Sequence, residues 1–326
     1  MTPEAARQAR TRLLAAFATV YIVWGSTYLA IAFAIETLPP FLMAAGRFLF
    51  AGGALYLWAR WRGAPAPRPA QWVWALLFGA LFFLIGNGAV SWVEQRLPSG
   101  LTALIVAMVS VWTALLEWLR PGGVRPTGMV LAGIVLGFLG VTLLVVPGGA
   151  GPAHAELFGV LLLMFSTFAW ALGSVLSRTA DLPDSTTLLS GMEMLAGGVL
   201  LLLASLVAGD WSRFVPSAVS LKSFLAFIYL AIVGSLVTFT CFAWLLKVST
   251  PNKVATAGYV NPMVAVFLGW VFGGETLSTR SFLASLVIVA SVMLIISGRG
   301  FAVRQSRPVL PARDAEALTQ RDKVVT

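Results

Sequence analysis

The sequence predicts an all-α transmembrane protein with ten membrane-spanning helices, arranged as two inverted five-helix repeats around a central cavity. Composition is the first reason: 59% of the 326 residues are hydrophobic and only 11% are charged, against about 25% charged residues in a soluble domain. The second reason is a series of ten apolar runs, and the third is a set of short motifs that recur in the second half of the chain.

The ten apolar runs are each bounded by charge, proline or glycine. Each is close to the roughly 20 residues that a helix needs to cross a ~30 Å hydrocarbon core. They cover residues 13–35, 41–59, 72–93, 98–119, 127–146, 157–177, 185–208, 221–246, 251–273 and 280–297. The first run is longer than the apolar core of a signal peptide, about 7 to 15 residues, so we expect an uncleaved first span.

The positions of the basic residues indicate orientation, since Lys and Arg accumulate in cytoplasmic segments. If the N-terminus is cytoplasmic, the outside gaps contain only Arg96, Arg213, Lys222 and Arg280, and all other basic residues except Arg47 lie in inside segments. We therefore expect a multi-pass protein of the bacterial inner membrane with both termini in the cytoplasm. The net charge of +9 then reflects topology, and no nucleic-acid partner is expected.

Several chemical classes are disfavoured by what the sequence lacks. One cysteine, Cys241, allows no internal disulfide or thiolate cluster, and one histidine, His154, allows no histidine-based metal or nucleophile site. The sequence contains no phosphate-binding loop and no nucleotide fingerprint. We therefore expect no cofactor, no bound metal and no enzymatic activity.

Short motifs recur in collinear order between the two halves. Residues 46–53 (GRFLFAGG) recur as 191–198 (GMEMLAGG), Trp24 corresponds to Trp170, and residues 89–92 (AVSW) correspond to 241–244 (CFAW). A five-helix duplication places the second copy upside down in the membrane, because five is odd. Inverted repeats of this kind are typical of alternating-access transporters whose site lies near the midplane. The predicted divisions are an N-terminal tail (1–12), two repeats (13–148 and 149–298) and a C-terminal tail (299–326).

Three motifs carry a resemblance to a known family. Residues 24–27 (WGST), residues 47–48 (RF) with 51–53 (AGG), and residues 261–262 (NP) with 273–275 (GGE) resemble the ten-helix EamA-type exporters of the drug/metabolite transporter superfamily. The resemblance covers nearly all of residues 13–298 and extends to the YddG-like exporters. It implies export of amino acids, aromatic ones included, or of related small metabolites. The fourth span departs from the pattern, with residues 109–111 (VSV) in place of the Asn-Pro pair.

The Asn261-Pro262 pair is the strongest indication of a site. It lies about 15 Å into the ninth span at ~1.5 Å per residue, near the middle of a ~30 Å core. Proline removes the hydrogen bond to the carbonyl of Gly258, and the side-chain amide adds a second polar group. Such groups are tolerated at this depth only against protein or a water-filled cavity. We therefore expect the substrate near Asn261, opposite Trp24 and close to Trp170.

Two charged residues lie within spans and leave alternatives open. Arg47, about 10 Å into the second span, could bind a substrate carboxylate or tie helix ends together. Glu193 could carry a proton, bind a substrate ammonium group or pair with Arg47. The other membrane acids, Glu94, Glu117 and Glu275, are expected at span ends.

The predicted substrate-binding set combines aromatic and polar residues, because a cavity for organic solutes is mostly apolar with a few orienting polar groups. It comprises Trp24, Ser26, Tyr28, Arg47, Asn87, Trp112, Trp170, Ser174, Glu193, Tyr259, Asn261 and Pro262.

Several functional alternatives remain open on sequence grounds. A drug or nucleotide-sugar transporter could use the same scaffold, and an intramembrane enzyme or a pore is disfavoured but conceivable. Expected partners are a small-molecule substrate and the lipid bilayer, with coupling to protons left open. The Gly-x-x-x-Gly motifs at Gly133 and Gly269 permit close helix contact, which we expect within the chain, and this favours a monomer over a dimer.

Overall fold

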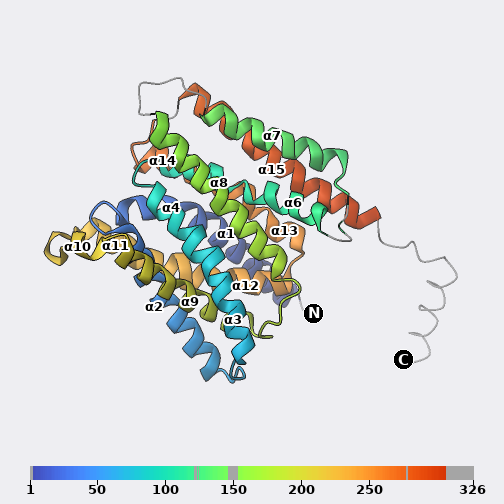
Figure 1. Ribbon diagram of the computed structural model, residues 1–326. Coiled ribbons are helices and arrows are strands. Elements are labelled where there is room, and N and C mark those ends of the chain that lie inside the picture. The colour runs from blue at the N-terminus through green and yellow to red at the C-terminus, as the bar shows by residue number, and fades with distance from the viewer. Residues whose placement is uncertain (1–2, 121–122, 124, 146–152, 277, 306–326) are drawn as a thin grey trace.

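The computed structural model describes residues 3–120, 123, 125–145, 153–276 and 278–305. Regular structure in these residues is helical throughout (Figure 1). The helices of the first half are α1 (Pro3–Ala34), α2 (Pro40–Trp61), α3 (Pro69–Phe78), η1 (Gly79–Asn87), α4 (Gly88–Val93), α5 (Ser99–Val106), α6 (Val109–Leu119) and α7 (Gly128–Val145). Those of the second half are α8 (Ala153–Leu176), α9 (Thr186–Val207), α10 (Asp210–Arg213), η2 (Pro216–Ala218), α11 (Leu221–Tyr229), η3 (Leu230–Val237), α12 (Thr238–Val248), α13 (Pro251–Ala255), α14 (Ala257–Phe272) and α15 (Thr279–Gln305).

The number of apolar helices agrees with the prediction. Within the described residues, nine helices are long and apolar enough to cross a membrane, and α7 adds a shorter apolar helix over Gly128–Leu144. The predicted all-α transmembrane class is therefore confirmed. The predicted division between the repeats at residue 148 and most of the C-terminal tail, beyond residue 305, lie outside the described residues.

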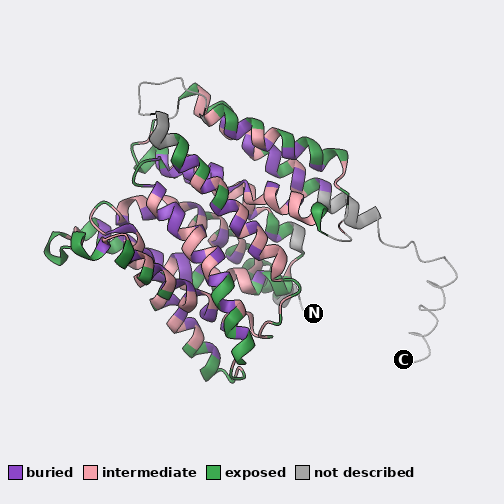
Figure 2. Cartoon of the chain, in the orientation of Figure 1, coloured by how far each residue is buried: buried purple, intermediate pink, exposed green. Residues whose placement is uncertain are grey.

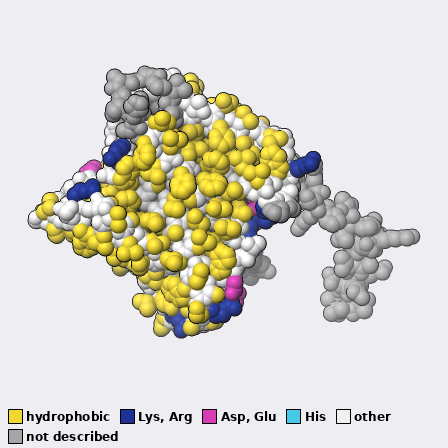
Figure 3. All heavy atoms as spheres, in the orientation of Figure 1, with side chains coloured by type: hydrophobic (Ala, Val, Ile, Leu, Met, Phe, Trp, Pro, Cys, Tyr) yellow, Lys and Arg dark blue, Asp and Glu magenta, His cyan; other side chains and the backbone are white. Residues whose placement is uncertain are grey.

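The surface has the distribution of side chains expected for a protein in lipid. Hydrophobic side chains cover most of the visible face, and the charged side chains lie towards its edges (Figure 3). Many large apolar side chains are exposed, among them Leu57, Trp61 and Phe272. Buried residues concentrate where the helices face one another (Figure 2). Such a belt is suited to contact with lipid tails rather than with water.

Helices that occupy equivalent positions in the two repeats pack against each other, α2 on α9 and α7 on α15. A Cβ atom at Gly52 would lie 2.7 Å from Leu195 N, and one at Gly191 would lie 2.6 Å from Tyr56 N. The backbones of α2 and α9 therefore approach too closely for any side chain at these positions. This contact explains why the motif around Gly52 recurs in the second half.

Gly133 and Gly137 serve the second of these helix pairs. A Cβ atom at Gly133 would lie 2.7 Å from Ile295 Cγ1, and one at Gly137 would lie 2.8 Å from Ser291 Oγ. Both neighbours belong to α15, which lies beside α7 in Figure 1. The prediction that this motif packs within the chain is therefore confirmed.

The third and eighth spans each contain a π-helical segment, η1 and η3, that the sequence analysis did not predict. The Asn87 side chain donates to the carbonyl of Phe82 at 3.1 Å, and the Thr238 hydroxyl donates to that of Val233 at 2.7 Å. Each carbonyl belongs to the residue five positions before the donor in the chain. A wide turn in a helix frequently marks a functional site, and here it occurs at equivalent places in both repeats.

The fourth and ninth spans are discontinuous. The fourth is interrupted between α5 and α6, at Ala107 and Met108, and the ninth between α13 and α14, at Thr256. The interruption of the ninth span thus precedes Pro262, which lies inside α14. The Thr256 hydroxyl donates to the carbonyl of Lys253 at 2.5 Å and so competes with the regular helix pattern.

Two acids of the second half cap helices of the first half. Asp210 Oδ2 accepts from the backbone N–H groups of Phe41 and Leu42 at 2.9 and 3.0 Å, at the start of α2. Glu275 accepts from Ser99 N and Oγ, both at 2.6 Å, and from Gly100 N at 3.0 Å, at the start of α5. Anions are favourable at helix N-termini. We call this end of the bundle, around Asp210 and Glu275, the capped end.

At the opposite end of the bundle, ion pairs connect the first half of the chain to the second. Arg178 contacts Glu117 and Arg68 contacts Asp181, each at 2.5 Å. The Arg68 and Asp181 side chains are 64% and 50% exposed. Exposed pairs of this kind contribute little stability, so the two halves are held more firmly at the capped end.

Candidate functional site

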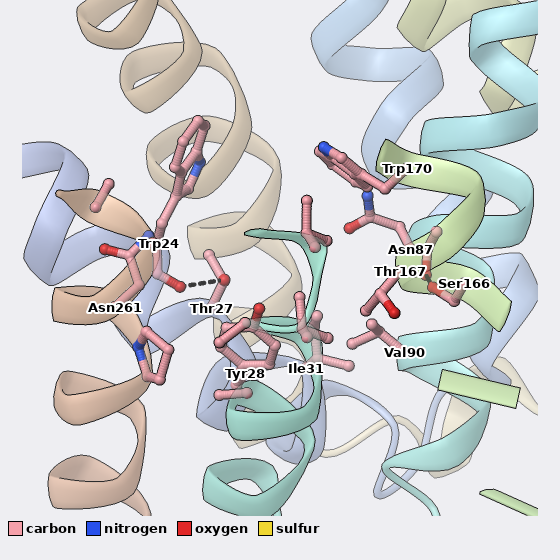
Figure 4. A pocket seen from close by; sticks show the side chains of 18 of the residues that line it. Trp24, Thr27, Tyr28, Ile31, Asn87, Val90, Ser166, Thr167, Trp170 and Asn261 are labelled. Atoms are coloured by element: carbon pink, nitrogen blue, oxygen red, sulfur yellow. Dashed lines mark hydrogen bonds between the residues drawn. The ribbon is translucent and has the colours of Figure 1, made fainter. Parts of the chain in front are cut away.

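A cavity of about 240 Å³ lies between the two halves, in the interior of the bundle (Figure 4). The interrupted spans contribute much of its wall, with Ala107 and Ser110 from the fourth span and Ala257 and Gly258 from the ninth. The complete lining is Trp24, Thr27, Tyr28, Ile31, Arg47, Gly86, Asn87, Val90, Ala103, Val106, Ala107, Val109, Ser110, Ser166, Thr167, Trp170, Phe239, Ala257, Gly258, Asn261 and Pro262.

More than half of the predicted site residues meet at this cavity. Figure 4 shows Trp24 and Asn261 on one side and Asn87 and Trp170 on the other. The predicted residues that line the cavity are Trp24, Tyr28, Arg47, Asn87, Trp170, Asn261 and Pro262.

Two predicted serines are occupied elsewhere and are absent from the cavity lining. Ser26 Oγ lies 2.6 Å from the Tyr229 hydroxyl, a contact between α1 and α11. Ser174 Oγ donates to the carbonyl of Trp170 in its own helix at 2.9 Å. Both hydroxyls therefore serve helix packing or the local backbone.

Three further predicted residues also lie away from the cavity. The Trp112 ring packs edge-on against Phe138 and Phe168, with ring centroids 5.4 and 5.5 Å apart. Tyr259 packs, partly buried, on the main hydrophobic core. Glu193 lies half-buried on α9. None of the three contributes to the lining of the cavity.

Arg47 is the one charged residue in the lining of this cavity, and it is 4% exposed. Its Nε donates to Ser235 Oγ at 2.8 Å, and its guanidinium carbon lies 4.6 Å from the centre of the Phe48 ring. Across the described ranges, no carboxylate lies within ion-pair distance of Arg47, so the pairing with Glu193 that the sequence allowed is wrong. A buried guanidinium without a counter-ion is costly. An anionic ligand at the cavity would remove that cost.

The ninth span provides hydrogen-bond acceptors at the cavity. Asn261 Oδ1 is buried and has no hydrogen-bond partner in the described part of the chain. Pro262 cannot donate to the carbonyl of Gly258, and Gly258 lies in the same wall. Buried acceptors without partners are uncommon, so this wall is suited to a ligand that carries N–H donors.

Two aromatic residues at repeat-related positions shape the cavity. The Trp24 ring contacts Phe239, with centroids 5.3 Å apart, and the Trp170 ring contacts Phe82 at 5.1 Å. Each tryptophan is therefore held by a phenylalanine of the other repeat, from the eighth and third spans respectively. The indole rings provide apolar surface for an organic solute.

Four hydroxyl residues of the lining are absent from the predicted substrate-binding set: Thr27, Ser110, Ser166 and Thr167. Thr27 donates to the carbonyl of Trp24 at 2.6 Å, the dashed bond in Figure 4, and Thr167 donates to that of Met164 at 2.8 Å. One signal was available: Ser166 and Thr167 precede Trp170 by four and three residues, a spacing that shares one helix face.

Comparison with known proteins identifies the family. The family model described as the EamA-like transporter family matches residues 12–146 and 157–297, nearly the whole of each half. The chain belongs to the EamA-like transporter family. It is therefore a membrane transporter of the drug/metabolite transporter superfamily, as its motifs predicted. A transporter of this family has a small-molecule substrate and functions in a lipid bilayer.

Two relatives and one solved structure illustrate what this EamA-like chain is similar to. The Escherichia coli K12 protein named uncharacterized inner membrane transporter YedA is 37% identical over 288 residues, 88% of this chain and 91% of YedA. A protein of the same strain named probable amino-acid metabolite efflux pump is 24% identical over 287 residues, 86% of this chain and 93% of that protein. One crystal structure matches with a TM-score of 0.59 and 23% sequence identity, and the match covers 87% of this chain and 97% of the chain in that structure. The two proteins therefore share the fold.

Proposed function

We propose that this EamA-like transporter exports amino acids or closely related small carboxylates by alternating access, with Arg47 as the residue that binds the carboxylate. The observation that carries the proposal is the buried guanidinium of Arg47, which lines the cavity without a carboxylate partner among the described residues. Guanidinium groups bind carboxylates through paired, charge-assisted hydrogen bonds. Asn261 Oδ1, an acceptor without a hydrogen-bond partner in the part of the chain that the structure describes, is suited to the ammonium group of the same ligand.

The size and charge of the cavity favour small substrates over the alternatives. Its volume of about 240 Å³ is below the roughly 300–1,000 Å³ typical of sites for drug-sized ligands. A nucleotide sugar carries two phosphate charges, whereas Arg47 is the single basic residue in this lining. Trp24 and Trp170 favour amino acids with an apolar or aromatic side chain.

We further propose that the protein lies in the bacterial inner membrane with both termini in the cytoplasm. The distribution of Lys and Arg supports this orientation, and the relative YedA is named an inner membrane transporter. The capped end would then face outwards. The relative named as a probable amino-acid metabolite efflux pump is in keeping with export.

The interrupted spans support an alternating-access mechanism. Such discontinuities let helix segments tilt separately around a central site, and the cavity wall includes Ala107 at one interruption and Ala257, next to Thr256, at the other. At the opposite end, exposed ion pairs between the halves can break at little cost. Opening of the capped end requires the loss of the caps on α2 and α5. We therefore expect the cavity to open more readily towards the end that carries Arg68 and Asp181.

Transport by the purified protein tests this proposal. The protein is reconstituted into liposomes, and uptake of a panel of labelled amino acids is measured with and without unlabelled substrate inside. Saturable uptake that is accelerated by internal substrate supports a carrier for that amino acid. Uptake that never saturates would indicate a pore, and a chemically altered product would indicate an enzyme. Preference for a nucleotide sugar or a bulky drug over every amino acid would contradict the assigned substrate class.

A further inference from the structure

Glu94 is a buried carboxylate that the described structure leaves without a partner. It follows α4 at the end of the third span, where its backbone N–H donates to the carbonyl of Val90 at 3.0 Å. The residue is 8% exposed, and neither carboxylate oxygen has a hydrogen-bond partner in the described residues. The expectation that it lies at a span end holds, but the side chain does not reach water.

The charged and titratable groups around Glu94 connect the cavity to the capped end. Glu94 ends α4, which packs against α2, the helix that carries the cavity residue Arg47. Glu275 accepts a hydrogen bond from Ser99 N at the start of α5, the next helix after Glu94 in the chain. The described side chains of α8, another neighbour of α4, include no titratable group. Glu94 therefore lies within electrostatic range of both the substrate-binding arginine and a carboxylate at the capped end.

An ionised Glu94 would be expensive in this environment. A carboxylate removed from water needs hydrogen bonds or a close counter-ion to offset the loss of hydration. Within the described ranges, neither Glu94 carboxylate oxygen has a hydrogen-bond partner, Arg47 lies beyond ion-pair distance, and Glu275 would repel a second negative charge. A bound proton removes the charge and with it most of the cost.

We propose that Glu94 is a proton-binding site that controls the affinity of Arg47 for the substrate carboxylate. With the proton bound, Arg47 has no nearby compensating negative charge, and the substrate carboxylate provides one. With the proton released, the Glu94 carboxylate attracts Arg47 and repels the substrate. The assignment of Glu94 as proton site rests on its burial alone, whereas the linkage to substrate rests on the proposed function. Proton and substrate then favour each other's binding.

Infrared spectroscopy tests the proton site without any substrate. Wild-type protein and the Glu94→Gln variant are reconstituted in phosphatidylethanolamine–phosphatidylglycerol liposomes at neutral pH, and the carbonyl band of protonated carboxyl groups is compared. Glu94→Gln has the shape of the protonated side chain and should remove one component of that band. Glu94→Asp keeps the carboxyl group and should shift the frequency of that component. It replaces Glu94→Gln in the comparison if the glutamine variant does not fold. The matched control is Glu36→Gln, since Glu36 is a half-exposed acid at the same end, paired with Lys222 at 2.5 Å.

Identical band intensity in wild type and Glu94→Gln would overturn the proton site. A second result would also overturn the proton site: sodium ions stabilise the wild type but not Glu94→Gln, and Glu94 contributes no protonated-carboxyl component. That result would assign the site to sodium.

The pH dependence of substrate affinity tests the linkage. For the amino acid transported best, the wild type and Glu36→Gln should bind about tenfold more tightly at pH 5.5 than at pH 8, within the usual range of coupling between sites. Glu94→Gln should retain the tight affinity at both values. A pH dependence in Glu94→Gln equal to that of the wild type would overturn the linkage. If no amino acid is transported at all, the proposed function fails, while the infrared comparison still decides whether Glu94 holds a proton.

Discussion

Arg47 Nε donates to Ser235 Oγ at 2.8 Å, and this hydrogen bond joins α2 of the first repeat to the π-helical segment η3 of the second. Ser235 is fully buried. The bond orients the guanidinium at the cavity wall, and none of the described hydrogen bonds involves its terminal nitrogens. Because the two partners belong to different halves, relative movement of the halves would change the position of the group that binds the substrate.

Ser235→Ala should weaken substrate binding without removing the charge of Arg47. Without this bond the guanidinium is no longer held at the cavity wall, so we expect KM to rise about tenfold, which is about 1.4 kcal/mol of binding. We also expect a lower midpoint of thermal unfolding, because a hydrogen bond to a charged group contributes about 1.5–3 kcal/mol to stability. Ser205→Ala is the matched control, because Ser205 is buried and donates only to the carbonyl of Leu202 in its own helix. Equal KM values for Ser235→Ala and the wild type would show that the bond does not position Arg47.

Asn261→Leu should lower affinity while leaving folding intact. Asn261 Oδ1 has no hydrogen-bond partner among the described residues, so its removal sacrifices no internal hydrogen bond to that atom and makes the span more apolar. Loss of a hydrogen bond to a charged ligand group should cost about 1.5–3 kcal/mol of binding. Substrate titration and thermal unfolding of the purified variant provide the two readings. Wild-type affinity in Asn261→Leu would place the site elsewhere in the bundle.

Glu275→Gln should destabilise the protein more than Asp181→Asn does. The Glu275 carboxylate accepts three hydrogen bonds at the start of α5, and an amide would replace one acceptor by a donor, at a cost of about 1–3 kcal/mol. Asp181 is half-exposed and pairs with Arg68, an arrangement worth at most about 1 kcal/mol. Thermal unfolding in detergent measures both. A larger loss for Asp181→Asn would contradict the view that the capped end is the firmer of the two.

Cysteine labelling in whole cells tests the proposed orientation. In a Cys241→Ala background, a membrane-impermeant maleimide added from outside should label Trp211→Cys, in the exposed α10 segment, and should not label Arg62→Cys, after α2. The predicted outside loop near His154 contains residues outside the described ranges, so Trp211 is the better position. Labelling of Arg62→Cys alone would reverse the orientation.

The sequence predicted the parts of this structure that depend on composition and length. Ten apolar runs were recognisable because a segment that crosses lipid must be apolar over about 20 residues. Arg47 and Asn261 were recognisable because polar groups are rare at that depth.

Features that depend on helix rotation and on packing between distant segments could not be predicted. Ser26 and Thr27 are adjacent, yet only Thr27 lines the cavity, and no signal in the sequence distinguishes the two. The interruptions at Ala107 and Thr256 do not coincide with a proline or glycine. That neither carboxylate oxygen of Glu94 has a hydrogen-bond partner among the described residues depends on side chains that are distant in the sequence.

The role of Arg47 in substrate binding is tested most directly by comparing a carboxylate substrate with the corresponding amide in Arg47→Gln. The pair is the best-transported amino acid and the same amino acid with its carboxylate converted to an amide, measured by counterflow in liposomes. Arg60→Gln, an arginine variant at the exposed end of the same helix, is the control. We expect the wild type and Arg60→Gln to prefer the carboxylate by tenfold or more, which corresponds to about 1.4 kcal/mol or more of binding. Arg47→Gln should bind the carboxylate more weakly and the amide as tightly as the wild type does, so the preference should disappear. An unchanged preference in Arg47→Gln would contradict the central claim that Arg47 binds the substrate.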